Sequence, residues 1–542
     1  MRVHPFCAMR PRLATGLGAM VLAAALSTGT VQPATAQVTL QAQAIAESAS
    51  GSDEIAAYYR ARDFAPIWTE AGEAAAARRS ALLTAIDFAP LHGLPASRYD
   101  VDALLAQMGA ARTAHDRGVL DVALTRIYLR LARDLQTGML TPAKVVPEII
   151  REVPLRDASQ YLDGILSADP VAFVHTLPPH NGEYVRLMKA KFQMERLMQA
   201  GGYGATVPAT QTMKPGQSGR AVIALRDRLT AMGYLKGSFT STYDADIEAA
   251  VRAYQSDMSM NVDGVVGPAT LGMINTSVED RLKSVIVAME RERWLNRPRG
   301  DRHVLVNLAD FSAKIVDFDR VTFETRAVIG ANSTGRRSPE FSDVMEFMII
   351  NPTWHVPRSI VVKEYLPQLQ QNPYAAAQLN VIDRNGTVVP RGAIDWRQFN
   401  ARTFPFEMKQ PPSNSNALGL VKFMFPNANN IYLHDTPSKS LFARDSRAFS
   451  HGCIRLQDPF DFAYALLAPQ MSDPKSFFQA KLASGRETQV NLETPIQVHL
   501  IYRTAVTTAK GGVSFRDDVY GRDRAIWDAL AAEGVTLAPV RG

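Results

Sequence analysis

Cys453 is the residue with the clearest capacity for chemistry, because it lies in the segment SHGCIRL between a histidine, a glycine and an arginine. The chain contains only 2 cysteines, so this thiol is nearly solitary. A thiol attacks a carbonyl carbon as a thiolate, which requires a nearby base or positive charge. Two histidines could serve as the base: His451, just before the cysteine, and His434, at the end of the apolar segment IYLHD.

The residues around the thiol could also stabilise the oxyanion that forms when a carbonyl is attacked. If residues 451–453 are extended, His451 and Cys453 point the same way, and His434 approaches from a neighbouring strand. Gly452 lacks a β-carbon, so its amide and that of Cys453 can face one point. Arg455 adds a positive charge on the same strand. This pattern predicts a cysteine nucleophile.

Two other roles for Cys453 stay open on this pattern. A free cysteine often packs as a small, inert hydrophobic residue. His434, His451 and Cys453 could instead bind zinc, which accepts nitrogen and sulfur ligands. No fourth histidine, cysteine or acid falls at ligand spacing, although Asp435 is close in sequence. We therefore expect neither a metal nor a cofactor.

The first 36 residues have the layout of a secretory signal peptide. Arg2, Arg10 and Arg12 precede an apolar run rich in small residues, and Ala34-Thr35-Ala36 fits an A-x-A cleavage site. The run is short for a membrane span, although a retained N-terminal anchor is the alternative. Cleavage would remove Cys7 and leave one unpaired cysteine in an oxidising compartment, which favours a reactive thiol. We expect a soluble periplasmic protein.

The composition is that of an ordinary globular protein. Of 542 residues, 46% are hydrophobic and 21% are charged, which excludes a disordered or fibrous chain. The formal net charge is +6, and three of the arginines lie in the expected signal peptide. Because no dense stripe of lysine and arginine accompanies this mild charge, we expect no nucleic-acid partner.

The N-terminal half of the chain has helical periodicity. Residues 37–205 predict a helical scaffold domain, in which Leu120, Leu124, Ile127, Leu131 and Leu135 share one helical face. A Gly- and Pro-rich linker follows, and residues 212–276 predict a three-helix module. The module resembles the peptidoglycan-binding module of bacterial wall enzymes in its segments GYL, AYQ and DGVVG. Residues 277–301 predict a connecting helix.

The period then changes to that of β-strands. Residues 302–490 predict a mostly β domain, with an insertion at about 358–414 between strands. So long an insertion is more often a lid or a binding loop than a simple connection. Residues 491–542 predict a C-terminal strand and helix. The predicted fold class is therefore multidomain α+β.

The segment around the thiol resembles the L,D-transpeptidase catalytic domain, in which a histidine precedes Ser/Thr-His-Gly-Cys by about fifteen residues. The segments FAPIWTE, LARDLQTGML, NPTWHVP, NALG and VYGRD resemble the large multidomain Gram-negative type, with a scaffold, a peptidoglycan-binding module and a capped catalytic domain in this order. Arg455 stands where many smaller members have asparagine, which leaves the network of donors open.

The resemblance implies a reaction and a set of roles. Cys453 would attack the third residue of a peptidoglycan tetrapeptide stem, expel D-alanine and pass the acyl group to the diaminopimelate amine of an acceptor stem. His434 would be the general base, and the Gly452 and Cys453 amides would form the oxyanion hole. A final group of residues would shape the site or contact substrate: Ser450, His451, Arg455, Tyr432 and Trp354. The family further implies that carbapenems acylate the same thiol.

Three alternatives to this reaction stay open. Water as the acceptor would give an L,D-carboxypeptidase, and a protein amine would anchor an outer-membrane protein to the wall. From another class, a wall-binding structural protein would use the helical modules and leave the thiol idle. The histidine and cysteine pair favours an enzyme over this last alternative.

Overall fold

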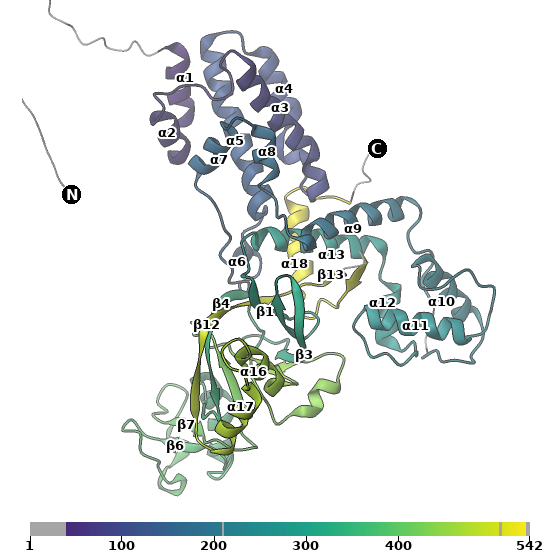
Figure 1. Ribbon diagram of the computed structural model, residues 1–542, viewed down its shortest axis with the longest axis vertical. Coiled ribbons are helices and arrows are strands. Elements are labelled where there is room, and N and C mark those ends of the chain that lie inside the picture. Colours follow the sequence, from purple (N-terminus) through teal and green to yellow (C-terminus); the bar gives the residue numbers. More distant parts are fainter. Residues whose placement is uncertain (1–38, 209–210, 509–511, 538–542) are drawn as a thin grey trace, which may run out of the picture.

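The computed structural model describes residues 39–208, 211–508 and 512–537. The expected signal peptide, residues 1–36, lies outside these ranges. Among the described residues, no helix is long and apolar enough to cross a membrane. A helical N-terminal region and a large, mostly β C-terminal domain occupy opposite ends of the molecule, so the predicted fold class is confirmed (Figure 1).

The scaffold is a bundle of helices around a core that contains Trp68, Tyr59 and Tyr128. Four of the five residues predicted to share one face of the long helix α5 are buried, and Ile127 is partly buried. The helical periodicity therefore predicted this element correctly. The helices are α1 (Leu40–Ala49), α2 (Asp53–Arg60), α3 (Glu73–Phe88), α4 (Val101–Ala110), α5 (Ala114–Thr137), α6 (Pro142–Val145), α7 (Ala158–Ile165), α8 (Pro170–His175) and α9 (Gly182–Gln199).

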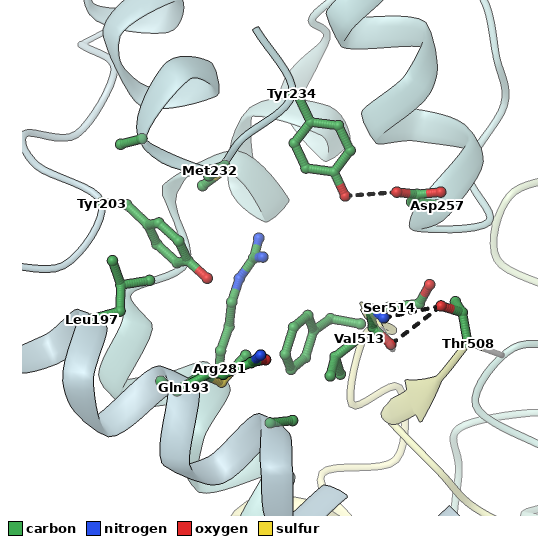
Figure 2. Close-up of a pocket in the computed structure, with 15 residues that line it drawn as sticks. Gln193, Leu197, Tyr203, Met232, Tyr234, Asp257, Arg281, Thr508, Val513 and Ser514 are labelled. Carbon is green, nitrogen blue, oxygen red and sulfur yellow. Dashed lines mark hydrogen bonds between the residues drawn. The ribbon is translucent and has the colours of Figure 1, made fainter. Parts of the chain in front are cut away.

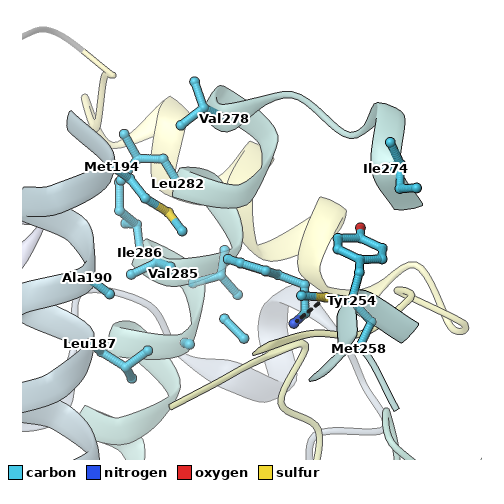
Figure 3. Close-up of a cluster of buried hydrophobic side chains, with 14 of the residues drawn as sticks. Leu187, Ala190, Met194, Tyr254, Met258, Ile274, Val278, Leu282, Val285 and Ile286 are labelled. Atoms are coloured by element: carbon cyan, nitrogen blue, oxygen red, sulfur yellow. Dashed lines mark hydrogen bonds between the residues drawn. The ribbon is translucent and has the colours of Figure 1, made fainter. Parts of the chain in front are cut away.

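The expected three-helix module is present and projects to one side of the molecule (Figure 1). Its helices are α10 (Arg220–Ala231), α11 (Ala245–Asp257) and α12 (Pro268–Asn275). The connecting helix is α13 (Val278–Trp294), which packs against α9 and against the C-terminal helix α18 (Arg522–Ala532). Figure 3 shows apolar side chains of α9, α11 and α13 meeting in one continuous core.

The end of α13 carries four consecutive charged residues, Glu290 to Arg293, all of which are buried. Arg293 pairs with Glu290 at 2.6 Å and donates to the His92 carbonyl of the scaffold at 2.7 Å. Arg291 pairs with Glu340 of the β domain at 2.6 Å. Since buried charges require such partners, α13 holds the scaffold and the β domain together by ion pairs as well as by apolar packing.

The β domain contains one large sheet in the order β10-β3-β11-β9-β8-β4-β12-β1-β2, which closes on itself because β2 also pairs with β3. β12 crosses the expected domain limit at residue 490, so the C-terminal segment supplies a strand in the middle of this sheet. The strands are β1 (Arg302–Asn307), β2 (Ser312–Asp317), β3 (Arg320–Gly330), β4 (Phe341–Ile350), β8 (Val421–Met424), β9 (Leu433–His434), β10 (Ala448–Ser450), β11 (Ile454–Leu456) and β12 (Thr488–Ile501).

Two helices and a β-hairpin complete this part of the chain. Helices α16 (Pro459–Leu467) and α17 (Pro474–Ala483) pack on the sheet, with Phe462 and Phe478 in its core. Beyond β12, a hairpin of β13 (Ala505–Thr507) and β14 (Val513–Phe515) leads to α18. β13 lies against α9 and α13, so the C-terminal segment joins the β domain to the helical junction.

The insertion between β4 and β8 folds into a subdomain, here called the cap (residues 354–410). Its own sheet has the order β5-β7-β6, formed by Trp354–His355, Glu407–Gln410 and Asn380–Ile382. The cap also contains α14 (Arg358–Ile360), the π-helical turn η3 (Val361–Tyr365) and α15 (Leu366–Gln371). It has a separate core built around Trp396, Leu369 and Met408. The predicted insertion is therefore a folded unit with a defined surface.

Candidate active site

Three neighbouring strands place polar side chains in one row. His434 on β9 lies opposite Lys422 on β8 and opposite Arg455 on β11. Residues directly opposite one another in a sheet project from the same face. The expectation that His434 approaches from a strand next to the thiol segment is confirmed, and Lys422 joins the row as a residue that the sequence analysis did not identify.

Residues 451–453 are not extended, because the chain bends sharply between β10 and β11, so the condition under which His451 and Cys453 would point the same way is not met. The Ser450 hydroxyl donates to the Cys453 carbonyl at 2.6 Å and accepts from the Gly452 amide at 3.1 Å, which closes the bend. Gly452 has a φ of +118°, and a β-carbon there would lie 3.2 Å from Ile431 Cδ1. The glycine therefore has a conformational role that the sequence analysis did not assign.

The bend changes the expectation for the oxyanion donors. The Gly452 amide is engaged by Ser450, so in this geometry it does not face the cavity as a free donor. The Gly452 carbonyl accepts from the Ser338 hydroxyl at 2.6 Å. The Gly452 carbonyl and the Cys453 N–H belong to the same peptide group, and in a trans peptide these two groups point in opposite directions. By holding the carbonyl, Ser338 therefore directs the Cys453 N–H away from itself. Ser338 is a second contact that sequence spacing did not reveal.

Cys453 is half-buried, and its sulfur donates to the Asn430 carbonyl at 3.4 Å. Burial raises the pKa of this thiol to about 11, while contacts with Tyr432 and the charges of Arg455 and Lys422 oppose that rise. Burial also raises the pKa of the Tyr432 phenol, and the nearby Cys453 adds to this effect. The thiol is therefore protonated at neutral pH.

His434 is buried, and its Nδ1 bonds to the Asp435 carbonyl. Because only an N–H can donate to a carbonyl, Nδ1 carries the proton of the neutral ring and Nε2 has the lone pair. Burial lowers the pKa of His434 to about 3 and the Arg455 charge lowers it further, while the bond to the Asp435 carbonyl opposes this. The imidazole is neutral at pH 7 and can accept a proton at Nε2.

Both groups open into one cavity of about 400 Å³ beneath the cap. Trp354 and Tyr365 of the cap contribute aromatic surface, with their rings 6.4 Å apart in an edge-on arrangement. Of the residues predicted for the site, only Gly452, which is buried, does not line the cavity. The others all line it: Trp354, Tyr432, His434, Ser450, His451, Cys453 and Arg455.

His451 bonds to the cap rather than to the thiol. Its Nε2 lies 2.6 Å from the Glu364 carboxylate, which also pairs with Arg336. Glu364 thus joins the cap to the residue two positions before the nucleophile. This contact could not be read from the sequence, because Glu364 and His451 are far apart in the chain.

Across the described ranges, the structure contains no group of three or more His, Cys, Asp or Glu side chains placed to hold a metal ion. The zinc alternative for His434, His451 and Cys453 therefore has no ligand geometry in that part of the chain. The arrangement combines a thiol, a neutral imidazole and the Arg455 guanidinium beside one cavity, with the Lys422 charge on the neighbouring strand. Such a set can support nucleophilic attack on a carbonyl carbon.

The raised pKa of Cys453 predicts a characteristic pH dependence of alkylation. Iodoacetamide reacts with the thiolate, so the rate at Cys453 should still rise about tenfold per pH unit between about pH 7 and pH 10. It should approach a plateau only near the pKa of about 11. Peptide mass spectrometry of timed samples would give the rate at this residue alone.

The control for this titration is the same protein in denaturant, where the plateau should shift to about pH 8.5. A folded-state plateau near that lower value would contradict the burial of the thiol.

Comparisons with known protein families agree with the domain order. Residues 53–190 match the family described as "Scaffold domain", residues 218–274 that described as "Putative peptidoglycan binding domain", and residues 301–495 that described as "L,D-transpeptidase catalytic domain". A Haemophilus influenzae protein named "Putative L,D-transpeptidase" is 30% identical over 265 residues, covering 47% of this chain and 53% of that protein. The chain thus spans about half the length of this curated relative.

Two solved structures are also similar. A crystal structure of an L,D-transpeptidase from Xylanimonas cellulosilytica has 17% identity, covers 54% of this chain and 98% of its own, and has a TM-score of 0.18. One from Stackebrandtia nassauensis has 14% identity, covers 55% and 97%, and has a TM-score of 0.22. The assignment of each domain depends on its match to one of the three family descriptions. The chain joins a scaffold domain, a peptidoglycan-binding domain and a catalytic domain, and this catalytic domain belongs to the L,D-transpeptidase family.

Proposed function

We propose that this protein is an L,D-transpeptidase that cross-links peptidoglycan stem peptides through a thioester on Cys453. The observation that carries the proposal is the cavity beneath the cap that both Cys453 and His434 line, within a domain of the L,D-transpeptidase family. The partner is peptidoglycan, as the donor tetrapeptide stem and the acceptor stem. The proposed compartment is the periplasm, reached after removal of residues 1–36.

The first step is attack of the Cys453 sulfur on the carbonyl of the third stem residue. His434 Nε2 takes the thiol proton as the carbon–sulfur bond forms. A free thiolate–imidazolium pair is unfavourable here, because the thiol pKa is raised to about 11 and the imidazole pKa is lowered to about 3. Proton transfer and attack should therefore occur together. Collapse breaks the carbon–nitrogen bond, and D-alanine leaves with the proton from His434.

The developing oxyanion needs donors already in position. We assign this role to the Cys453 amide, which Ser338 orients through the Gly452 carbonyl. Arg455 and Lys422 supply positive charge near the sulfur and favour its anionic form. Tyr432 and Trp354 are assigned to substrate contact, since both line the cavity. Ser450 maintains the bend that presents the amide.

The second step transfers the acyl group. The side-chain amine of an acceptor stem attacks the thioester carbonyl, His434 removes the excess proton, and Cys453 is released as a thiol. Water in place of the amine would give an L,D-carboxypeptidase, and a protein amine would anchor an outer-membrane protein. The cap favours the amine, because a folded cover over the cavity limits access of water.

The contact between Glu364 and His451 predicts that the cap is fastened at the site. Glu364→Gln should weaken the pairs with His451 and Arg336, so the cap should open more often. We expect KM for the donor stem to rise about fivefold with a smaller change in kcat, and hydrogen exchange in residues 358–414 to accelerate. Donor stem should slow this exchange in the unsubstituted protein.

The control variant is Glu407→Gln, which removes a carboxylate from the exposed face of the same subdomain. It should leave both KM and exchange unchanged. Equal exchange in the Glu364→Gln variant and the parent protein would refute the fastening role.

The experiment that tests the proposed function is analysis of stem products after incubation of the protein with isolated peptidoglycan. Dimers joined between two diaminopimelate residues, with free D-alanine in equal amount, are expected. Tripeptide stems alone would favour the carboxypeptidase, and attached protein would favour anchoring. Binding to peptidoglycan without any new product would support the non-catalytic wall-binding alternative and overturn the proposal.

A further inference from the structure

A larger cavity, of about 590 Å³, lies away from the candidate active site, where four parts of the chain meet. Its walls come from the end of α9, from α10 and α11 of the three-helix module, from α13, and from the β13–β14 hairpin. We call it the junction cavity. Figure 2 shows Arg281 of α13 extending into this space, with Tyr203 on one side and the Tyr234–Asp257 pair across from it.

Arg281 is only 4% exposed, yet no acid pairs with it among the described residues. One of its nitrogens, Nη2, donates to the Tyr254 hydroxyl at 2.8 Å and to the Met273 carbonyl at 3.0 Å. Its Nε is buried without a hydrogen-bond partner in the described structure. The guanidinium otherwise faces the rings of Phe515 and Tyr203, at 4.9 and 5.2 Å.

A second buried arginine increases the positive charge. Arg228 of α10 also lies over the Tyr203 ring, 5.7 Å from its centroid, and burial together with the Arg281 charge lowers the pKa of Arg228. Arg228 differs from Arg281 because all of its nitrogens donate to backbone carbonyls, among them those of Ile274, Gly204 and Thr276. The excess charge therefore remains with Arg281, whose guanidinium is incompletely bonded.

Three further buried arginines near the junction show how an acid can balance such a charge. Arg291 and Arg522 both pair with Glu340, and Arg293 pairs with Glu290. A buried cation without an anion is costly, and a planar guanidinium matches a carboxylate. In the part of the chain that the structure describes, Arg281 has neither an acid nor a full set of carbonyl acceptors, and it lies beside an open cavity, so an external carboxylate can supply the missing partner.

The opposite wall carries the complementary charge. Asp257 lines the same cavity, and its carboxylate accepts from the Tyr234 hydroxyl at 2.9 Å. No basic side chain forms an ion pair with this carboxylate in the described ranges. A cation on one wall and an anion on the other suit a ligand that carries both charges. Asp257 also disfavours inorganic anions such as phosphate, which would bring only negative charge.

We propose that the junction cavity binds a free amino acid, or the C-terminal end of a peptide whose side chain carries an ammonium group near the terminal carboxylate. The carboxylate bonds to Arg281, and the ammonium group bonds to Asp257. The aromatic rings of Tyr203 and Phe515 contact the apolar part of the ligand. Because the cavity joins the three-helix module, the scaffold helix α9 and the hairpin after β12, occupancy would fix the module against the rest of the chain.

The test uses the full chain with the substitution Cys453→Ala, so that binding is measured without turnover and independently of the proposed reaction. Calorimetry and hydrogen exchange would be recorded with free D-alanine, free L-alanine and a tetrapeptide stem, each against its amidated and its N-acetylated form. We expect a bound ligand to slow hydrogen exchange at the end of α9, at α10 and α11, and at β14. If free amino acids bind as tightly as the stem, the ligand of the cavity is a free amino acid. If only the stem binds, the ligand is the end of a peptide.

Two variants and one control locate the charges. Arg281→Gln should abolish the protection from hydrogen exchange that each carboxylate ligand gives. Asp257→Asn should weaken the binding of the zwitterionic ligands about tenfold and leave the binding of the N-acetylated forms unchanged. Lys283→Gln, on the same helix but outside the cavity, should change nothing. Absence of protection at the cavity with all ligands, or equal binding of amidated forms, would overturn the proposal. If the Arg281→Gln variant fails to fold, the Asp257→Asn variant and the amidated ligands still test the proposal.

Discussion

Turnover of peptidoglycan stems should fall by at least about 10³-fold in the Cys453→Ala variant, because alanine cannot form the thioester. The fold should persist, since the thiol makes a single weak bond to the Asn430 carbonyl. Rates of D-alanine release, measured beside thermal unfolding, would separate loss of chemistry from loss of structure. Cys453→Ser should also be nearly inactive, because a hydroxyl is far less acidic than a thiol.

The matched control is Glu407→Gln, at the exposed carboxylate of the cap, which should leave turnover unchanged. A Cys453→Ala variant that keeps a tenth or more of the parent rate would show that another group does the chemistry.

The Ser338→Ala variant should lose about 10- to 100-fold in the rate of acylation, with little change in KM. Ser338 is a positioning residue: its hydroxyl holds the Gly452 carbonyl and so directs the Cys453 amide toward the cavity. Without it, the Gly452 carbonyl and the Gly330 amide, both buried, would lack a partner. Each such loss costs about 1–3 kcal/mol of stability, so the fold should be weakened as well.

Two further variants distinguish orientation of the amide from general destabilisation. Ser338→Thr keeps the hydroxyl and should restore most of the rate. The Tyr520 hydroxyl donates to the Gly330 carbonyl and accepts from the Ser338 amide, and neither bond involves Gly452. Tyr520→Phe removes both of these bonds. It should lower the melting temperature yet leave acylation intact. An equal fall in rate for Tyr520→Phe and Ser338→Ala would refute the positioning role.

Local sequence patterns predicted those parts of the fold that depend on near neighbours in the chain. The apolar stripe of α5 and the three helices of the module follow from residues three and four apart, and the structure confirms them. The approach of His434 from a strand beside β11 is confirmed in the same way. In the helices, side-chain periodicity determines which face is buried.

Contacts between distant segments could not be predicted from such patterns. Lys422 alternates with buried residues in the strand LVKFM, but nothing local shows that β8 lies next to β9. Glu364 and Ser338 reach the thiol segment from far along the chain. The four charged residues at the end of α13 would ordinarily be expected at the surface, and their burial depends on partners such as Glu340.

The bend at the thiol shows a different limit. An extended segment 451–453 was one possibility for residues between two strands, and the positive φ of Gly452 excludes it. The glycine itself was the available indication, because it tolerates this backbone conformation where other residues are strained. The bend turns His451 toward the cap and leaves the Cys453 amide as the proposed oxyanion donor.

The most direct test of the central proposal is mass spectrometry of the intact protein during reaction with a tetrapeptide donor in the absence of acceptor. We predict an adduct with the mass of the donor minus D-alanine, located on the Cys453 peptide and released by hydroxylamine, as expected for a thioester. A carbapenem should modify the same residue. An adduct on another residue, or turnover at the parent rate in Cys453→Ala, would contradict the thioester mechanism.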